Sequence, residues 1–77
     1  MTQDQIIVDG VEFSIGDELI YDGEVRSEIV DFEVMEAEKG EEYWLIVRRV
    51  ETNRRARYLA GSIAVSVQSE RGYEISD

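Results

Sequence analysis

The sequence predicts a small, single-domain protein of mostly β structure. Apolar and polar residues alternate along most of the 77 residues, and Asp-Gly pairs at 9–10 and 22–23 separate the alternating stretches. The chain has no proline, no low-complexity segment and no internal repeat that would indicate a linker or a second domain. We therefore expect one domain over residues 1–77, with an ordered core at about 5–68 and a loose tail at 69–77.

The first half predicts an N-terminal hairpin followed by two strands. Apolar residues at 6–8 and 11–13 lie on either side of Asp9-Gly10, a typical hairpin turn. A strand follows at 15–21, and a longer half-buried strand follows at about 27–36. The segment 33–39 also has helix propensity, but the period of two before it favours a strand.

The second half predicts a hairpin, a helical turn and a short last strand. The continuous apolar run at 43–47 is typical of a central strand, and Thr52-Asn53 suits the hairpin tip before a strand at 56–59. Residues 60–63 break the alternation and predict one tight helical turn. Val65-Ser66-Val67 predicts the last strand, and within the tail Tyr73 and Ile75 offer a short edge strand as an alternative.

Two segments resemble Src-homology-3 (SH3) domains. Residues 13–20, FSIGDELI, are similar to the family's "L-S-F-x-x-G-D-x-L" motif, and 43–45 with 58–65 resemble its "W-W-x-A … G-Y-I-P-S-N-Y-V" half. The resemblance implies a single small five-stranded SH3-like barrel, all-β, with an N-terminal hairpin and one short helical turn before the last strand. Ala60 stands at the groove proline and Ile63 at the groove tyrosine, so polyproline binding is not implied.

The strand order is closer to that of Tudor and KOW barrels than to that of SH3 domains. The 20 residues between Asp22 and Tyr43 are long enough for a full extra strand. The resemblance to these families implies binding of methylated side chains, binding of nucleic acid, or docking of other proteins.

The net charge is strongly negative, and almost all of the basic residues are arginines. The chain has 18 acidic and 8 basic residues, a net charge of −10, and only one lysine among its cations. Self-repulsion at this charge is screened by salt, so the composition is typical of a protein in a salt-rich cytoplasm. Two alternatives remain: an acidic mimic of nucleic acid that binds a basic protein, and an ordinary acidic domain with a basic partner.

The basic residues are concentrated in one decapeptide. Residues 1–47 have a net charge of −12, whereas residues 48–57 have five arginines and one glutamate, for +4. The arginines are Arg48, Arg49, Arg54, Arg55 and Arg57. They are expected either to pair with the domain's own carboxylates or to contact phosphate or an acidic partner.

The aromatic residues supply both core and site candidates. Trp44 and Phe32 are predicted to lie in the core, with Trp44 as its central anchor. Tyr21, Tyr43 and Tyr58 are candidates for an aromatic cage around a methylated cation. Strand alternation predicts that Tyr43 and Trp44 lie on opposite faces of the sheet.

Several function classes are excluded or disfavoured. Without cysteine or histidine there are no disulfides, no Cys/His metal sites and no Ser–His or Cys–His catalytic groups. No apolar run is long enough to span a membrane, and we expect no cofactor and no catalysis. The sequence therefore predicts a non-enzymatic binding or adaptor module that contacts another protein. The alternatives are a KOW-like nucleic-acid module that uses the arginines, although the net charge disfavours nucleic acid, and an acidic nucleic-acid mimic.

Overall fold

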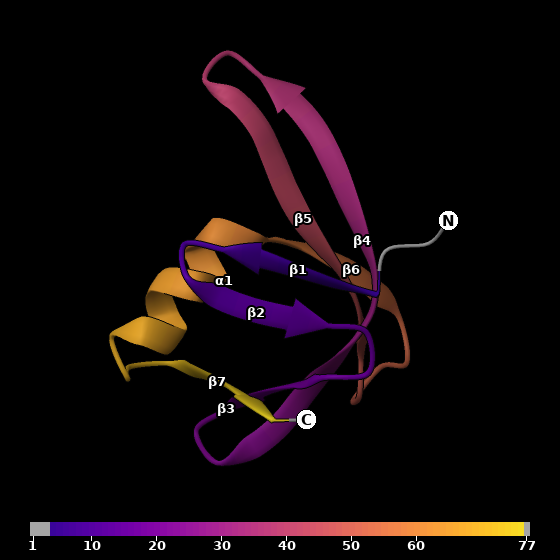
Figure 1. Cartoon of the computed structure of the whole chain (residues 1–77). Helices are drawn as coiled ribbons and strands as arrows, with labels where there is room; N and C mark the ends of the chain where they lie inside the picture. Colours follow the sequence, from indigo (N-terminus) through magenta and orange to yellow (C-terminus); the bar gives the residue numbers. More distant parts are fainter. Residues whose placement is uncertain (1–3, 77) are drawn as a thin grey trace.

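Two antiparallel β-sheets and one helix make up the fold (Figure 1). The computed structural model describes residues 4–76. The N-terminal sheet pairs β1 (Gln5–Val8) with β2 (Val11–Ser14). The second sheet has the order β6-β5-β4-β3-β7, with β3 (Glu18–Tyr21), β4 (Glu24–Ala37), β5 (Gly40–Arg49), β6 (Arg55–Leu59) and β7 (Tyr73–Ser76). Helix α1 (Ala60–Gln68) connects β6 to β7. The predicted mostly-β class is confirmed, but within residues 4–76 no strand pairing joins the edge strands β6 and β7, so the sheet is open.

The predicted hairpin turns are confirmed. Asp9 and Gly10 have φ values of 51° and 81°, and Asp22 and Gly23 have values of 54° and 77°. Positive φ at both central residues is the backbone of a type I′ turn, which matches the twist of the strands that it joins. Asn53 has φ 57° in the β5–β6 turn, as its tolerance of the left-handed region predicted.

β4 has a β-bulge beside the corner between β2 and β3. The register with β5 shifts between Ile29 and Asp31, so Val30 has no partner and the strand bends there. Ile29 donates its N–H to the Asp17 carbonyl at 2.8 Å and accepts from Gly16 N–H at 2.8 Å. The buried Asp17 carboxylate also accepts the Ser14 N–H at 3.0 Å. These bonds hold the β2–β3 corner against the middle of β4.

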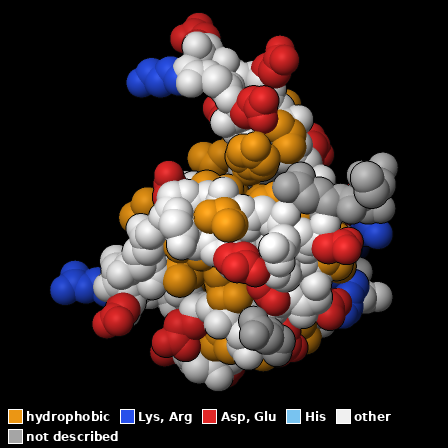
Figure 2. Space-filling view, in the orientation of Figure 1, with side chains coloured by type: hydrophobic (Ala, Val, Ile, Leu, Met, Phe, Trp, Pro, Cys, Tyr) orange, Lys and Arg blue, Asp and Glu red, His pale blue; other side chains and the backbone are white. Residues whose placement is uncertain are grey.

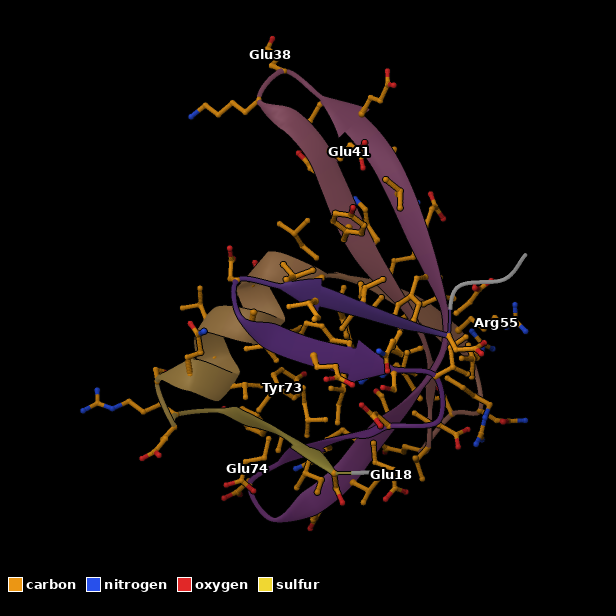
Figure 3. All side chains as sticks on the ribbon, in the orientation of Figure 1. Glu18, Glu38, Glu41, Arg55, Tyr73 and Glu74 are labelled. Carbon is orange, nitrogen blue, oxygen red and sulfur yellow. The ribbon has the colours of Figure 1, made fainter. Side chains whose placement is uncertain are left out.

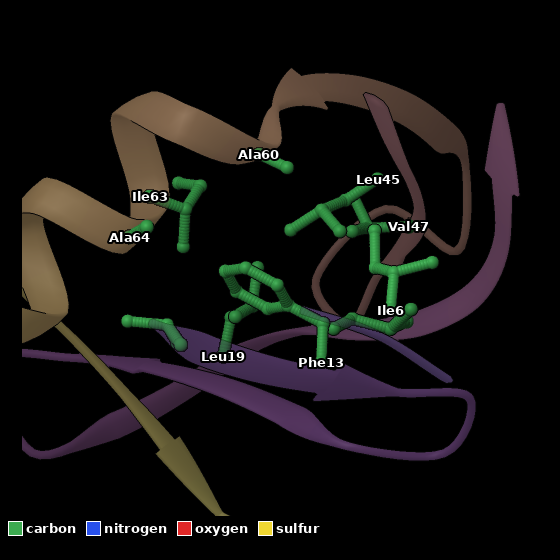
Figure 4. Close-up of a cluster of buried hydrophobic side chains, with 10 residues drawn as sticks. Ile6, Phe13, Leu19, Leu45, Val47, Ala60, Ile63 and Ala64 are labelled. Carbon is green, nitrogen blue, oxygen red and sulfur yellow. The ribbon is translucent and has the colours of Figure 1, made fainter. Parts of the chain in front are cut away.

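The core lies between the N-terminal hairpin, the helix and the concave face of the large sheet (Figure 4). Its ten buried hydrophobic residues are Ile6, Val11, Phe13, Leu19, Ile29, Leu45, Val47, Ala60, Ile63 and Ala64. Phe13 is the only aromatic residue among them and is 0% exposed. We conclude that Phe13 on β2 is the central side chain of the core.

The prediction that Trp44 anchors the core is wrong. Leu45 and Val47 are the buried residues of β5, so Trp44 lies on the opposite, outer face of the sheet, where it is half-buried. There the Arg57 guanidinium carbon lies 5.1 Å from the centroid of the Trp44 ring. Phe32 is half-buried and packs against the margin of the core. Tyr43 also packs against the core, so the predicted separation of Tyr43 and Trp44 onto opposite faces is confirmed.

The C-terminal part also differs from the prediction. A nine-residue helix replaces the single helical turn at 60–63 and the strand at 65–67. It forms because Ala60, Ile63 and Ala64 lie on one helical face toward the core, whereas Val65 is 61% exposed. The expected loose tail contains β7, which pairs with β3 and confirms the alternative of a short edge strand.

Replacement of Phe13 by alanine should therefore destabilise the domain more than replacement of Trp44. We expect Phe13→Ala to lower the free energy of unfolding by about 3–5 kcal/mol, since it leaves a cavity in the core. Trp44→Ala should cost about 1–2 kcal/mol, in the range of ordinary partly exposed positions. Urea unfolding followed by circular dichroism measures both variants, and a larger loss for Trp44→Ala would contradict this assignment of the core.

Candidate functional site

A pocket of about 590 Å³ lies where the β3–β4 and β5–β6 turns meet. The N–H of Val50 donates to the carbonyl of Arg26 at 3.0 Å and so joins the two turns. The lining residues are Tyr21, Glu24, Val25, Arg26, Arg49, Val50, Glu51, Tyr58 and Tyr73. We call this site the tyrosine pocket. It occupies a part of the concave face that the N-terminal hairpin does not cover.

Three tyrosines from three strands converge in this pocket. Tyr21 on β3 and Tyr73 on β7 are directly opposite in register, and their ring centroids are 5.2 Å apart. Tyr58 on β6 lies 6.3 Å from Tyr73, although β6 and β7 are the two edges of the sheet. The sheet must therefore curve enough to bring its edges toward each other. Both separations fall in the range of favourable aromatic pairs.

Part of the pocket wall is apolar and open to solvent. Tyr21 is 46% exposed, Val50 is 50% exposed and Val25 is 38% exposed. Tyr58 and Tyr73 are half-buried and lie deeper. The pocket thus has an aromatic floor and an exposed apolar rim, a surface that a ligand could cover.

Burial raises the pKa of the Tyr73 hydroxyl above its ordinary value of 10.0. The neighbouring Tyr58 raises this pKa further, whereas the Arg49 guanidinium partly lowers it. Tyr73 is therefore protonated at neutral pH, and its hydroxyl can donate a hydrogen bond to a ligand.

The charges in the pocket are mixed. Arg26 forms an ion pair with Glu24 at 3.4 Å and donates from Nε to the Tyr21 carbonyl at 3.4 Å. Arg49 and Glu51 form no ion pair within residues 4–76. The two arginines and two glutamates of the lining balance in charge, so the pocket offers no net negative charge to attract a methylated cation.

The cage predicted from Tyr21, Tyr43 and Tyr58 does not form. Tyr21 and Tyr58 line the pocket, but their third aromatic neighbour is Tyr73 (labelled in Figure 3). Tyr43 lies elsewhere on β5, and its hydroxyl donates to Glu41 Oε2 at 3.3 Å. In the sequence, Tyr73 and Ile75 alternate with polar residues, and this pattern predicted a short edge strand. The pattern does not show where in the sheet that strand pairs, so it did not place Tyr73 in the pocket.

The five arginines of residues 48–57 do not form one surface. Arg48 pairs with Glu28 at 2.9 Å and Arg57 pairs with Glu33 at 3.0 Å. Both contacts agree with the expectation that arginines pair with the domain's own acids, and such exposed pairs contribute about 0–1 kcal/mol each. Arg49 lines the tyrosine pocket on the concave face, whereas Arg48 and Arg55 are directly opposite in register on the outer face, which also carries Arg57. Three of the five arginines therefore share the outer face of the sheet, and two of these three are paired with the domain's own acids.

No protein-family model, no curated protein and no solved structure matches the chain. Over residues 4–76, the structure contains no group of three or more acidic side chains placed to hold a metal ion. Nor does this part of the chain contain a helix long and apolar enough to cross a membrane.

Tyrosine ionisation should show the distinct environment of Tyr73. Tyr73 should release its proton above the ordinary tyrosine pKa of about 10, and Tyr73→Phe should remove that late step. Because the unfolded chain releases this proton more readily, the stability linked to Tyr73 is intact below about pH 10 and falls as the pH rises further. Ultraviolet absorbance of tyrosinate during an alkaline titration measures the effect. A single common step for all four tyrosines would contradict it.

Proposed function

We propose that the protein is a non-enzymatic binding module that holds a short segment of a partner protein in the tyrosine pocket. The convergence of Tyr21, Tyr58 and Tyr73 from three strands supports this proposal most directly. Tyrosine combines a large apolar ring with a polar hydroxyl, and it is enriched at protein interfaces. A partner side chain could cover the exposed rim formed by Val25 and Val50.

The polar groups around the rings favour a peptide over other ligands. Two arginines and two glutamates give the pocket no net charge, so it does not select strongly for an anion or a cation. The tyrosine hydroxyls and guanidinium groups can instead bond the carbonyls of an extended segment. A net charge of −10 opposes the approach of nucleic acid.

The proposal also includes a relationship to SH3-like domains, which the curved five-stranded sheet supports. It further includes a salt-rich cytoplasm as the place where the protein works, which the acidic composition supports.

Selection of random peptides displayed on phage tests this function on the full chain. Peptides that bind the wild type should lose affinity for Tyr21→Ala by about 2 kcal/mol, as expected for a central aromatic contact. Tyr21 is 46% exposed, so its replacement should leave the fold intact. Isothermal titration calorimetry measures the affinities.

Val65→Ala is the control, because it removes an exposed apolar side chain from α1 outside the pocket. Its affinity for the selected peptides should equal that of the wild type. The proposed function is contradicted if no selected peptide binds Tyr21→Ala more weakly than the wild type, or if the library yields no binders.

A further inference from the structure

The β4–β5 hairpin extends well beyond the strands on either side of it. β3 pairs with β4 only up to Glu28, and β6 pairs with β5 only from Trp44. In residues 34–43, β4 and β5 therefore pair only with each other, and they form a two-stranded ribbon that projects from the rest of the domain (Figure 1). We call this ribbon the arm. An isolated two-stranded ribbon is marginally stable in water.

One face of the arm continues the concave face of the sheet and remains uncovered. Val34 and Tyr43 are directly opposite in register on this face. Val34 is 48% exposed and Tyr43 is half-buried at the edge of the core. Figure 2 shows hydrophobic side chains where the arm meets the body. Val34 thus stands exposed next to the core, whereas Tyr43 beside it is covered only in part.

The next pair toward the tip is acidic. Glu36 and Glu41 are directly opposite in register on the same face as Val34 and Tyr43. Like charges in this position destabilise a ribbon, because opposed Cβ atoms are about 5 Å apart. Neither carboxylate has an ion pair within residues 4–76, and the arm has four glutamates and one lysine in all. Figure 3 labels Glu38 and Glu41 on the arm.

The arginines around the β5–β6 turn are distant from this pair, and Lys39 on the arm forms no ion pair within residues 4–76. The tip of the arm and the β5–β6 turn lie at opposite ends of β5, and a strand of this length spans about 30 Å. A second copy of the chain would bring a further charge of −10. A partner of opposite charge is therefore the electrostatic complement of this surface.

We propose that the arm is a docking surface for a basic segment of a partner protein, with a lysine or arginine next to an apolar side chain. The apolar side chain covers Val34 and Tyr43, and the cationic group lies between Glu36 and Glu41. The stem of the lysine or arginine covers further apolar surface. This contact is separate from the tyrosine pocket and does not depend on the function proposed for it.

A heptapeptide of alternating lysine and leucine is the probe, titrated into the isotopically labelled full chain. Amide shifts in the nuclear magnetic resonance spectrum should concentrate in residues 34–43. Glu36→Gln with Glu41→Gln should weaken binding about tenfold or more. The matched control, Glu12→Gln with Glu74→Gln, changes the net charge equally at exposed acids on β2 and β7. It should bind the peptide nearly as tightly as the wild type.

Three results would overturn the proposal. Equal weakening in both double variants, with shifts spread over the surface, would mean a general attraction of the acidic protein for polycations. Equal binding of a lysine–serine heptapeptide would show that the apolar pair contributes nothing. A dimer in sedimentation equilibrium that Val34→Ser dissociates would assign the surface to a second copy.

Discussion

The rest of the structure depends on a mismatch in size between its two layers. The covering hairpin has two strands of four residues, whereas β4 and β5 beneath it have 14 and 10 residues. Phe13 on β2 of the hairpin joins the two layers, because its side chain is fully buried against the large sheet. Only the middle of the concave face can therefore form a closed core, and the two ends of that face keep their apolar side chains partly exposed.

Both candidate binding surfaces follow from this incomplete cover. At one end, the curvature of the sheet brings Tyr58 on β6 toward Tyr73 on β7, and the tyrosine pocket forms between the turns. At the other end, the arm extends past its neighbours with Val34 uncovered and two glutamates opposed. A domain of this size can give up little apolar burial without a gain elsewhere. Binding of a partner at either end would bury the remaining apolar surface.

The sequence predicted turns and strands better than it predicted where their side chains lie in the folded domain. The Asp-Gly turns and the strand at 27–36 were predicted correctly, because turn chemistry and a period of two depend on neighbouring residues. Trp44 was misplaced because a continuous apolar run does not reveal which of its two faces meets the core. The tyrosine pocket was predicted in part, with Tyr21 and Tyr58 correct and Tyr43 wrong, since the pairing of β7 with β3 depends on contacts between residues distant in the chain.

The central claim is that the N-terminal hairpin covers only the middle of the large sheet. Native-state hydrogen exchange tests this claim most directly. The account predicts that amides of Ile29, Leu45 and Val47 exchange only through global unfolding, since these residues lie under the hairpin. Amides of the arm should exchange through local opening with a lower free energy, and Phe13→Ala should remove most of the difference. Equal protection along the whole of β4 and β5 in the wild type would contradict the account, because it would mean that the arm is as firmly held as the core.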